Sequence, residues 1–330
     1  MASTFRYTVL CGLLLGLGCA TAPQKAPEQA LRTVDLALKY SPGQIDRYRV
    51  SSEVTRSVEW QGLSPNEAGQ FKGGTTGRIL DLTYTQRVDR VDPNGNADIE
   101  VTLDDIQYRG FMVGEPTLDY DSTRPDNPPC AMAGLVGAAY ALRVGPDGRV
   151  LEVLDTRTAM ARIDGKLPQA QTATRLVSDE AIESRHTIRS LASRPAGPAT
   201  EGQVWPGSHA FSFDQMGRRT FDLTYTYRGL EAGPGGERAV IDMNSVSTPV
   251  GPHAPAMSAL FHSRETYSGR TTLDPQTGRV VEHHEDLEVN WTFVDPTATP
   301  QAGEEPKSGQ MTARQVFYLK RIDPEAPCTR

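Results

Sequence analysis

The same strand-like hexamer occurs twice in this chain, as LDLTYT at residues 80–85 and as FDLTYT at residues 221–226. In each copy apolar residues alternate with Asp and Thr, a period-two pattern that is typical of a half-buried antiparallel strand. Leu82 and Leu223 should both face the buried side of a sheet, because a one-residue slip would expose every apolar side chain. The residues predicted to face away are Asp81, Thr83, Asp222 and Thr224.

The segments that follow the two hexamers also correspond. The turn VDPNGN leads into the alternating run ADIEVTL, as AGPGGE leads into RAVIDMNSV. Further along, GPDGRVLEV at residues 145–153 matches DPQTGRVVE at residues 274–282, and each is a turn that enters a strand. We interpret the correspondence as two similar β-meanders, residues 31–155 and residues 196–330, which form one shared domain.

Other alternating runs extend the predicted sheet. Residues 34–40 alternate up to the turn SPGQ, and the most regular apolar stripe in the chain is Leu287, Val289, Trp291 and Phe293. Long alternating strands joined by short turns favour an antiparallel sheet with one face covered.

A helical connection is predicted between the meanders, at residues 156–195, with a break at Pro168 and an N-cap at Ser178. The run AMAGLVGAAYAL after Cys130 is a second helical candidate. The expected fold is therefore mostly β with a helical insert (α+β). It is a large curved antiparallel sheet or half-barrel built from two similar meanders, with helices packed on one face.

The N-terminus carries a targeting segment at residues 1–18, which is set aside from the fold. Arg6 precedes the apolar run VLCGLLLGLG, which is too short to span a bilayer. Small residues then lead to Cys19, and the segment resembles a bacterial lipoprotein signal, in which this cysteine is lipidated. The alternative is an ordinary secretory signal cut near Ala20 or Ala22. Residues 19–30, rich in Ala and Pro, are expected to form the lipid anchor and a flexible tether.

The remaining cysteines fit an extracytoplasmic compartment. Cys11 leaves with the signal and Cys19 is lipidated, which leaves Cys130 and Cys328. In an oxidising compartment these two thiols most simply form one disulfide, and the alternative is two buried or unpaired thiols.

The net charge of the chain limits the classes of binding partner that it can have. The formal net charge is -7, and the sequence shows no basic stripe. An acidic body of this kind argues against nucleic acid and against electrostatic docking on anionic lipid. The predicted contact with a membrane is therefore through the N-terminal lipid.

The order of motifs is similar to that of a group of uncharacterised bacterial envelope lipoproteins. It comprises a Y-x-V strand at Tyr48, the DLTYT strand, a GPDGRV turn, a helical middle, a return through residues 202–205 and a second meander. The resemblance implies a lipid-anchored protein of the bacterial cell envelope. Because Ala20 follows the cysteine, resemblance to enterobacterial sorting rules implies the outer membrane, facing the periplasm or the cell surface. More distantly, the expected architecture is similar to lipoprotein carriers of the outer-membrane localisation pathway.

The segment EHHED contains the densest group of potential metal ligands. On a strand, Glu282, His284, Asp286 and Glu288 would share one face, and His283 and Glu285 the other. A zinc site needs three or four converging ligands. Besides His284 and its acidic neighbours, the remaining ligands would have to come from His209, His253 or His262. The alternative is a solvated strand face. No HExxH, GxSxG or P-loop motif occurs, and we predict no metal, no cofactor and no catalytic residues.

Two functions from different classes follow. The first is a non-enzymatic envelope lipoprotein whose curved sheet holds a hydrophobic ligand or a segment of an envelope protein. Its candidate lining residues are Tyr84, Tyr225, Trp291 and Phe293, for which the alternative is ordinary core. The second is a ligand-free scaffold or interaction protein whose partners meet an edge strand or loop. A metal-dependent periplasmic enzyme is the remaining alternative.

Overall fold

The computed structural model describes residues 32–62, 73–213, 216–247, 262–294 and 307–322. The described residues belong to one compact unit, Arg32–Arg330. The predicted signal, Cys19 and tether lie outside the described residues, as does Cys328. Within the described residues no helix has the length and apolar character needed to cross a bilayer.

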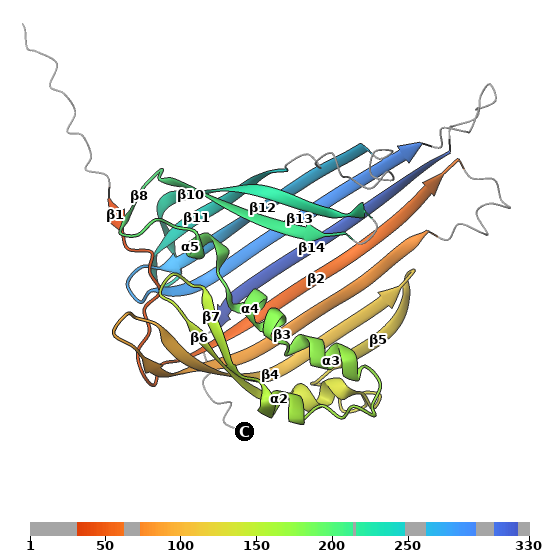
Figure 1. The fold of residues 1–330 in the computed structure, drawn as a ribbon, viewed down its shortest axis with the longest axis horizontal. Helices are drawn as coiled ribbons and strands as arrows, with labels where there is room; N and C mark the ends of the chain where they lie inside the picture. Colours follow the sequence, from red (N-terminus) through yellow and green to blue (C-terminus); the bar gives the residue numbers. More distant parts are fainter. Residues whose placement is uncertain (1–31, 63–72, 214–215, 248–261, 295–306, 323–330) are drawn as a thin grey trace, which may run out of the picture. The chain divides into compact units, whose positions relative to one another are not determined.

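Twelve strands in the described part of the chain form one antiparallel sheet (Figure 1). Their order is β7-β6-β4-β3-β2-β14-β13-β12-β11-β10-β9, and β5 pairs with one end of β4. The strands before the helical connection are β2 (Ile45–Gln61), β3 (Gly74–Val91), β4 (Ala97–Met112), β5 (Glu115–Asp121), β6 (Ala139–Val144) and β7 (Val150–Asp155). Those after it are β9 (Val204–Ser212), β10 (Arg218–Gly233), β11 (Gly236–Ser247), β12 (His262–Asp274), β13 (Arg279–Val294) and β14 (Ser308–Ile322). A separate short pair joins β1 (Thr33–Val34) to β8 (Ala199–Thr200).

The two copies of the hexamer occupy corresponding strands, β3 and β10. The two matched turns likewise join β6 to β7 and β12 to β13, and each matched strand lies six places along the sheet from its counterpart. Leu82 and Leu223 are 1% and 2% exposed, whereas Asp222 and Thr224 are exposed. Asp81 and Thr83 are intermediate. The predicted register and the predicted fold class are confirmed.

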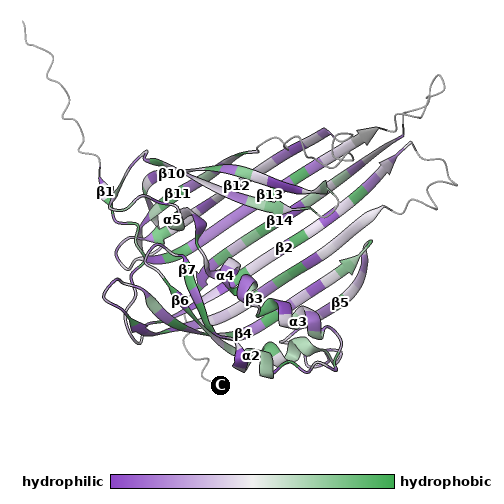
Figure 2. Cartoon of the chain, in the orientation of Figure 1, coloured by the Kyte–Doolittle hydropathy of each residue, from purple (hydrophilic) through white to green (hydrophobic). Residues whose placement is uncertain are grey.

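Along β3, β4, β10 and β13, alternation separates a buried inner face from a more exposed outer face, and Figure 2 shows alternating bands of hydropathy in the sheet. On β13, Leu287, Val289 and Trp291 are at most 1% exposed. The outer face carries arginine–carboxylate pairs, such as Arg143 with Asp98 at 2.7 Å. Such solvated pairs contribute little free energy, so the sheet is held mainly by its inner face.

Contacts between distant strands show that the sheet curls. β9 and β13 lie four places apart, which would separate their side chains by roughly 19 Å in a flat sheet. Instead the ring centroids of Phe213, just after β9, and Trp291 are 5.2 Å apart. Those of Phe211 and Tyr267, on β9 and β12, are 5.1 Å apart. Among the described residues no backbone pairing joins β7 to β9, so the curled sheet is open.

The chain crosses this open side through four short helices, α2 (Arg157–Ala161), α3 (Ala170–Leu176), α4 (Asp179–His186) and α5 (Arg189–Ala192) (Figure 1). They cover part of the inner face, and Ile182, Ile188 and Leu191 are at most 3% exposed. Ser178 caps α4 as predicted, because its hydroxyl accepts a hydrogen bond from the Ala181 backbone N–H at 3.3 Å.

The helical connection is more broken than the sequence pattern suggests. The predicted helix after Pro168 is divided into α3, α4 and α5. Between α4 and α5 the chain is extended at Thr187, and the Ile188 backbone N–H donates to the Gly148 carbonyl at 2.9 Å. A hydrogen bond to the β6–β7 turn thus replaces the next helical one.

The prediction of a helix after Cys130 is wrong for most of its length. Only a 3-10 turn, η1 (Ala131–Leu135), forms, and Ala139–Val144 is strand β6. Gly137 ends the turn with a φ of +71°. Tyr140 and Leu142 then alternate inward and pair with β4, so a free strand edge outweighs local helical preference.

The prediction of a strand at residues 34–40 is also mostly wrong, since only Thr33–Val34 pairs with another strand, β8. Instead this segment joins the two matched turns. The Leu38 N–H donates to the Pro146 carbonyl at 2.7 Å, and the Lys39 N–H to the Gly278 carbonyl at 3.1 Å. Gly278 has a φ of +64°, and a Cβ there would lie 2.7 Å from the Lys39 nitrogen, so this contact requires glycine.

Candidate ligand-binding groove

Beyond the helices, two adjoining cavities lie against the inner face. One of about 210 Å³ is bounded by β2, β3, β12, β13, β14, β9 and the helical connection. The other, of about 200 Å³, lies between β2, β3, β13, β14 and the end of β9. Val54, Arg78 and Gln315 line both cavities, which we call together the groove. Their combined volume falls in the lower part of the range of ~300–1,000 Å³ found for small-molecule sites.

One half of the groove is mainly apolar. Its lining includes Val54, Phe213, Trp291, Met311 and Ala313. Trp291 is fully buried beneath this surface, with Phe213 edge-on against it. Val54 and Met311 stay partly exposed, so this half presents apolar side chains to solvent.

The other half contains a buried ionic network. Glu285 pairs with Arg189 of α5 at 2.9 Å and accepts a hydrogen bond from the Tyr267 hydroxyl at 2.6 Å. Its second oxygen lies 3.1 Å from His283 Nε2, and His283 Nδ1 lies 2.8 Å from the Thr271 hydroxyl. Burial alone would raise the pKa of Glu285. The His283 hydrogen bond and the Arg189 charge outweigh it and hold that pKa well below its usual range.

This network joins the helices to the sheet. Ser190 of α5 continues it, with its hydroxyl 2.7 Å from that of Thr271 on β12. A hydroxyl, an imidazole and a carboxylate in series are also the parts of a hydrolytic triad. Here Thr271 and Ser190 are only 1% and 2% exposed, which leaves no access for a substrate to either oxygen. The arrangement instead fixes the position of Arg189 at the edge of the groove.

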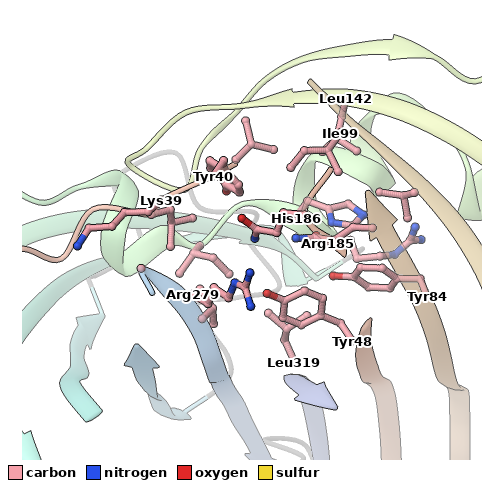
Figure 3. Close-up of a pocket in the computed structure, with 18 residues that line it drawn as sticks. Lys39, Tyr40, Tyr48, Tyr84, Ile99, Leu142, Arg185, His186, Arg279 and Leu319 are labelled. Carbon is pink, nitrogen blue, oxygen red and sulfur yellow. The ribbon is translucent and has the colours of Figure 1, made fainter. Parts of the chain in front are cut away.

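A third cavity lies at the end of the inner face that the helices cover (Figure 3). Tyr48 and Tyr84 stack there with centroids 5.6 Å apart, and His186 meets the edge of Tyr84 at 5.0 Å. Burial, with a smaller contribution from the Arg185 charge, lowers the pKa of His186 to about 3. Its Nε2 lies 2.7 Å from the Tyr140 hydroxyl, within hydrogen-bond distance. The cavity volume is about 50 Å³, which holds water but no organic ligand.

The four predicted lining residues have different surroundings. Trp291 lines the groove. Tyr84 lines only the small covered cavity among those described, and Tyr225 stacks on Trp205 in the core, with centroids 6.0 Å apart. Phe293 belongs to β13, and its side chain lies outside the described part of the structure.

Sequence reasoning missed Arg78, Arg189, Phe213 and the buried side of EHHED. His283 and Glu285 are 3% and 5% exposed and face inward, so the solvated-face interpretation fails for them. A signal was present, because Leu287, Val289 and Trp291 continue the same odd-numbered face. His284 and Asp286 do face outward, where Asp286 pairs with Arg314 at 3.1 Å. Among the described residues no three His, Cys, Asp or Glu side chains are placed to hold a metal ion.

Cys130 is 2% exposed, and within the described residues it forms no disulfide. Its predicted partner Cys328 lies outside them, so the bridge stays a prediction. Denatured, unreduced protein from an oxidising compartment should contain no free thiol at either position.

Comparison of the sequence with protein-family models finds no match, and comparison with curated proteins finds none either. Among solved structures, lipovitellin, in a study of its lipid–protein interactions, is 12% identical with a TM-score of 0.44. That match covers 88% of this chain and 26% of the lipovitellin chain, so this chain spans about a quarter of that length. The Salmonella type III secretin InvG is 11% identical over 86% of this chain and 63% of its own, with a TM-score of 0.17. Likenesses of this size carry no inference about this chain.

Proposed function

We propose that this protein is a non-enzymatic binding protein that holds a small hydrophobic molecule in the groove. The observation that carries the proposal is the pair of adjoining cavities on an inner face that the helices leave uncovered. A ligand seated there would remove the partly exposed side chains of Val54, Met311 and Phe317 from water. Burial of apolar surface contributes about 25 cal/mol per Å² and supplies the affinity.

We also propose that the protein is anchored to a membrane of the bacterial cell envelope through lipid on Cys19, at the outer membrane. The sequence pattern of residues 1–30 supports this. Labelled fatty acid should enter the full-length protein in a bacterial host and be lost in Cys19→Ser. No incorporation in the parent protein would favour the secretory alternative.

Ligand binding is tested with a diazirine-bearing fatty acid, which is cross-linked by light to the full-length protein and mapped by mass spectrometry. Adducts should gather on peptides that contain Trp291, Met311 and Phe213. Ala313→Phe places a ring in the apolar half and should abolish these adducts, because Ala313 lines that cavity. The matched control is Ala141→Phe, on the outward side of β6, which should leave labelling unchanged. Adducts spread over the outer face, or unaffected by Ala313→Phe, would refute the proposal.

A second candidate is a ligand-free interaction protein that pairs through an edge strand. β7 ends the sheet and exposes Leu151 and Leu154, which are 48% and 37% accessible. Such a function predicts no saturable adduct in the groove and loss of partner binding in Leu151→Lys.

A further inference from the structure

Arg78 on β3 faces the groove where its two halves meet, since it lines both cavities. It is exposed, and it forms neither an ion pair nor a side-chain hydrogen bond with any described residue. By contrast, many outer-face arginines, such as Arg90 and Arg143, are paired with carboxylates. An arginine with all its donors available beside an apolar surface is suited to a planar or tetrahedral anion.

The other charges that line the groove do not neutralise Arg78. Glu285 is already bonded to Arg189, His283 and Tyr267. Glu53 contacts Thr55 at 3.3 Å and Arg314 at 3.7 Å. Among the described residues that line the groove, Arg78 therefore keeps an uncompensated positive charge, although the chain as a whole carries -7.

We infer that the ligand is an anionic amphiphile with one acyl or alkyl chain. This inference rests on the proposed function and names its ligand class. The carboxylate or phosphate binds the Arg78 guanidinium, and the chain lies in the apolar half against Phe213, Trp291 and Met311. The combined volume of the two cavities lies in the lower part of the usual range for ligand sites, which favours an amphiphile with one chain over a lipid with several.

The test uses the full-length protein and competition against the photoactivatable fatty acid. The competitors share one chain length and differ in headgroup: fatty acid, alkyl phosphate, fatty alcohol and alkyltrimethylammonium. The acid or the phosphate should compete at concentrations about tenfold or more below those of the alcohol, and the cation should be weakest. Preference between acid and phosphate distinguishes a free fatty acid from a phospholipid-derived ligand.

Arg78→Gln should remove the advantage of the anions and leave the alcohol unchanged. The matched control is Arg109→Gln, because Arg109 is also exposed but lies on the outward side of the neighbouring strand β4. Equal competition by acid and alcohol in the parent protein would overturn the anionic headgroup and retain a hydrophobic ligand. An advantage that persists in Arg78→Gln would also overturn it. Absence of any saturable labelling would overturn both the inference and the proposed function.

Discussion

The covered and uncovered ends of the inner face are made by the same strands and differ in what lies over them. At the covered end, Tyr48 and Val50 of β2 and Leu319 of β14 are at most 5% exposed, and the cavity is about 50 Å³. A few residues along the same strands, Val54 and Met311 stay partly exposed and line a groove of two larger cavities. The helical connection makes the difference.

This difference shows that strand patterning alone does not separate a core from a binding surface. Val50 and Val54 lie four residues apart on β2, so both side chains are on the inward face of the strand. Whether an inward residue is core or groove depends on how far the helices extend. The boundary is set where Arg189 of α5 meets Glu285 of β13.

The largest expected effect is at that boundary. Glu285→Ala leaves the largely buried charge of Arg189 unpaired and should lower the free energy of unfolding by about 3–5 kcal/mol. Denaturant unfolding measures the loss. Glu288→Ala, on the outward face of the same strand, is the control and should change little. The double variant Glu285→Met/Arg189→Met should recover part of the loss, and no recovery would contradict a coupled pair.

Next in size is truncation of the buried core of the sheet. Leu82→Ala and Leu223→Ala should each lower the free energy of unfolding by about 2–5 kcal/mol, because both leucines are fully buried. Thr83→Ala and Thr224→Ala should cost far less, since these side chains lie on the other face. A large loss at Thr83 with a small one at Leu82 would reverse the assigned register.

The pH dependence of stability tests how well the helices exclude water from His186 at the covered end. The unfolded chain binds a proton at His186 below pH ~6.5, whereas the folded chain does so only near a pKa of about 3. Stability should therefore fall as the pH drops from 7 to 5, with about 1–2 kcal/mol due to His186. His186→Gln should flatten the profile over this interval. An unchanged slope would show that His186 is hydrated in the folded protein.

The smallest effect is expected in the groove itself. Val54→Ala should lower the free energy of unfolding by less than about 1 kcal/mol, because part of this side chain already contacts water. The same substitution at Val50, which is 1% exposed on the same strand, is the matched comparison and should cost clearly more. Equal losses would mean that the groove is closed in solution.

The sheet was predictable from residue patterns because its strands are long and alternate regularly. Errors arose where a tertiary hydrogen bond replaced a local preference, as at Ile188, or where a sheet edge recruited a helix-like run, as at Ala139–Val144. Of the groove, Trp291 could be proposed as a lining residue from its stripe. Arg78 and Phe213 could not, because they meet only when the sheet curls, and curvature is set by contacts between distant strands.

The place of β14 in the sheet has a consequence for folding during synthesis. It pairs with β2, the first long strand, on one side and with β13 on the other. A chain made from its N-terminus leaves an edge of β2 unpaired until nearly all of the described residues have been synthesised. Pairings of such sequence separation form slowly, and open edges invite association with other chains. A nascent chain of this fold should therefore depend on a chaperone that shields the unpaired edge of β2 until β14 has been synthesised and can pair with it.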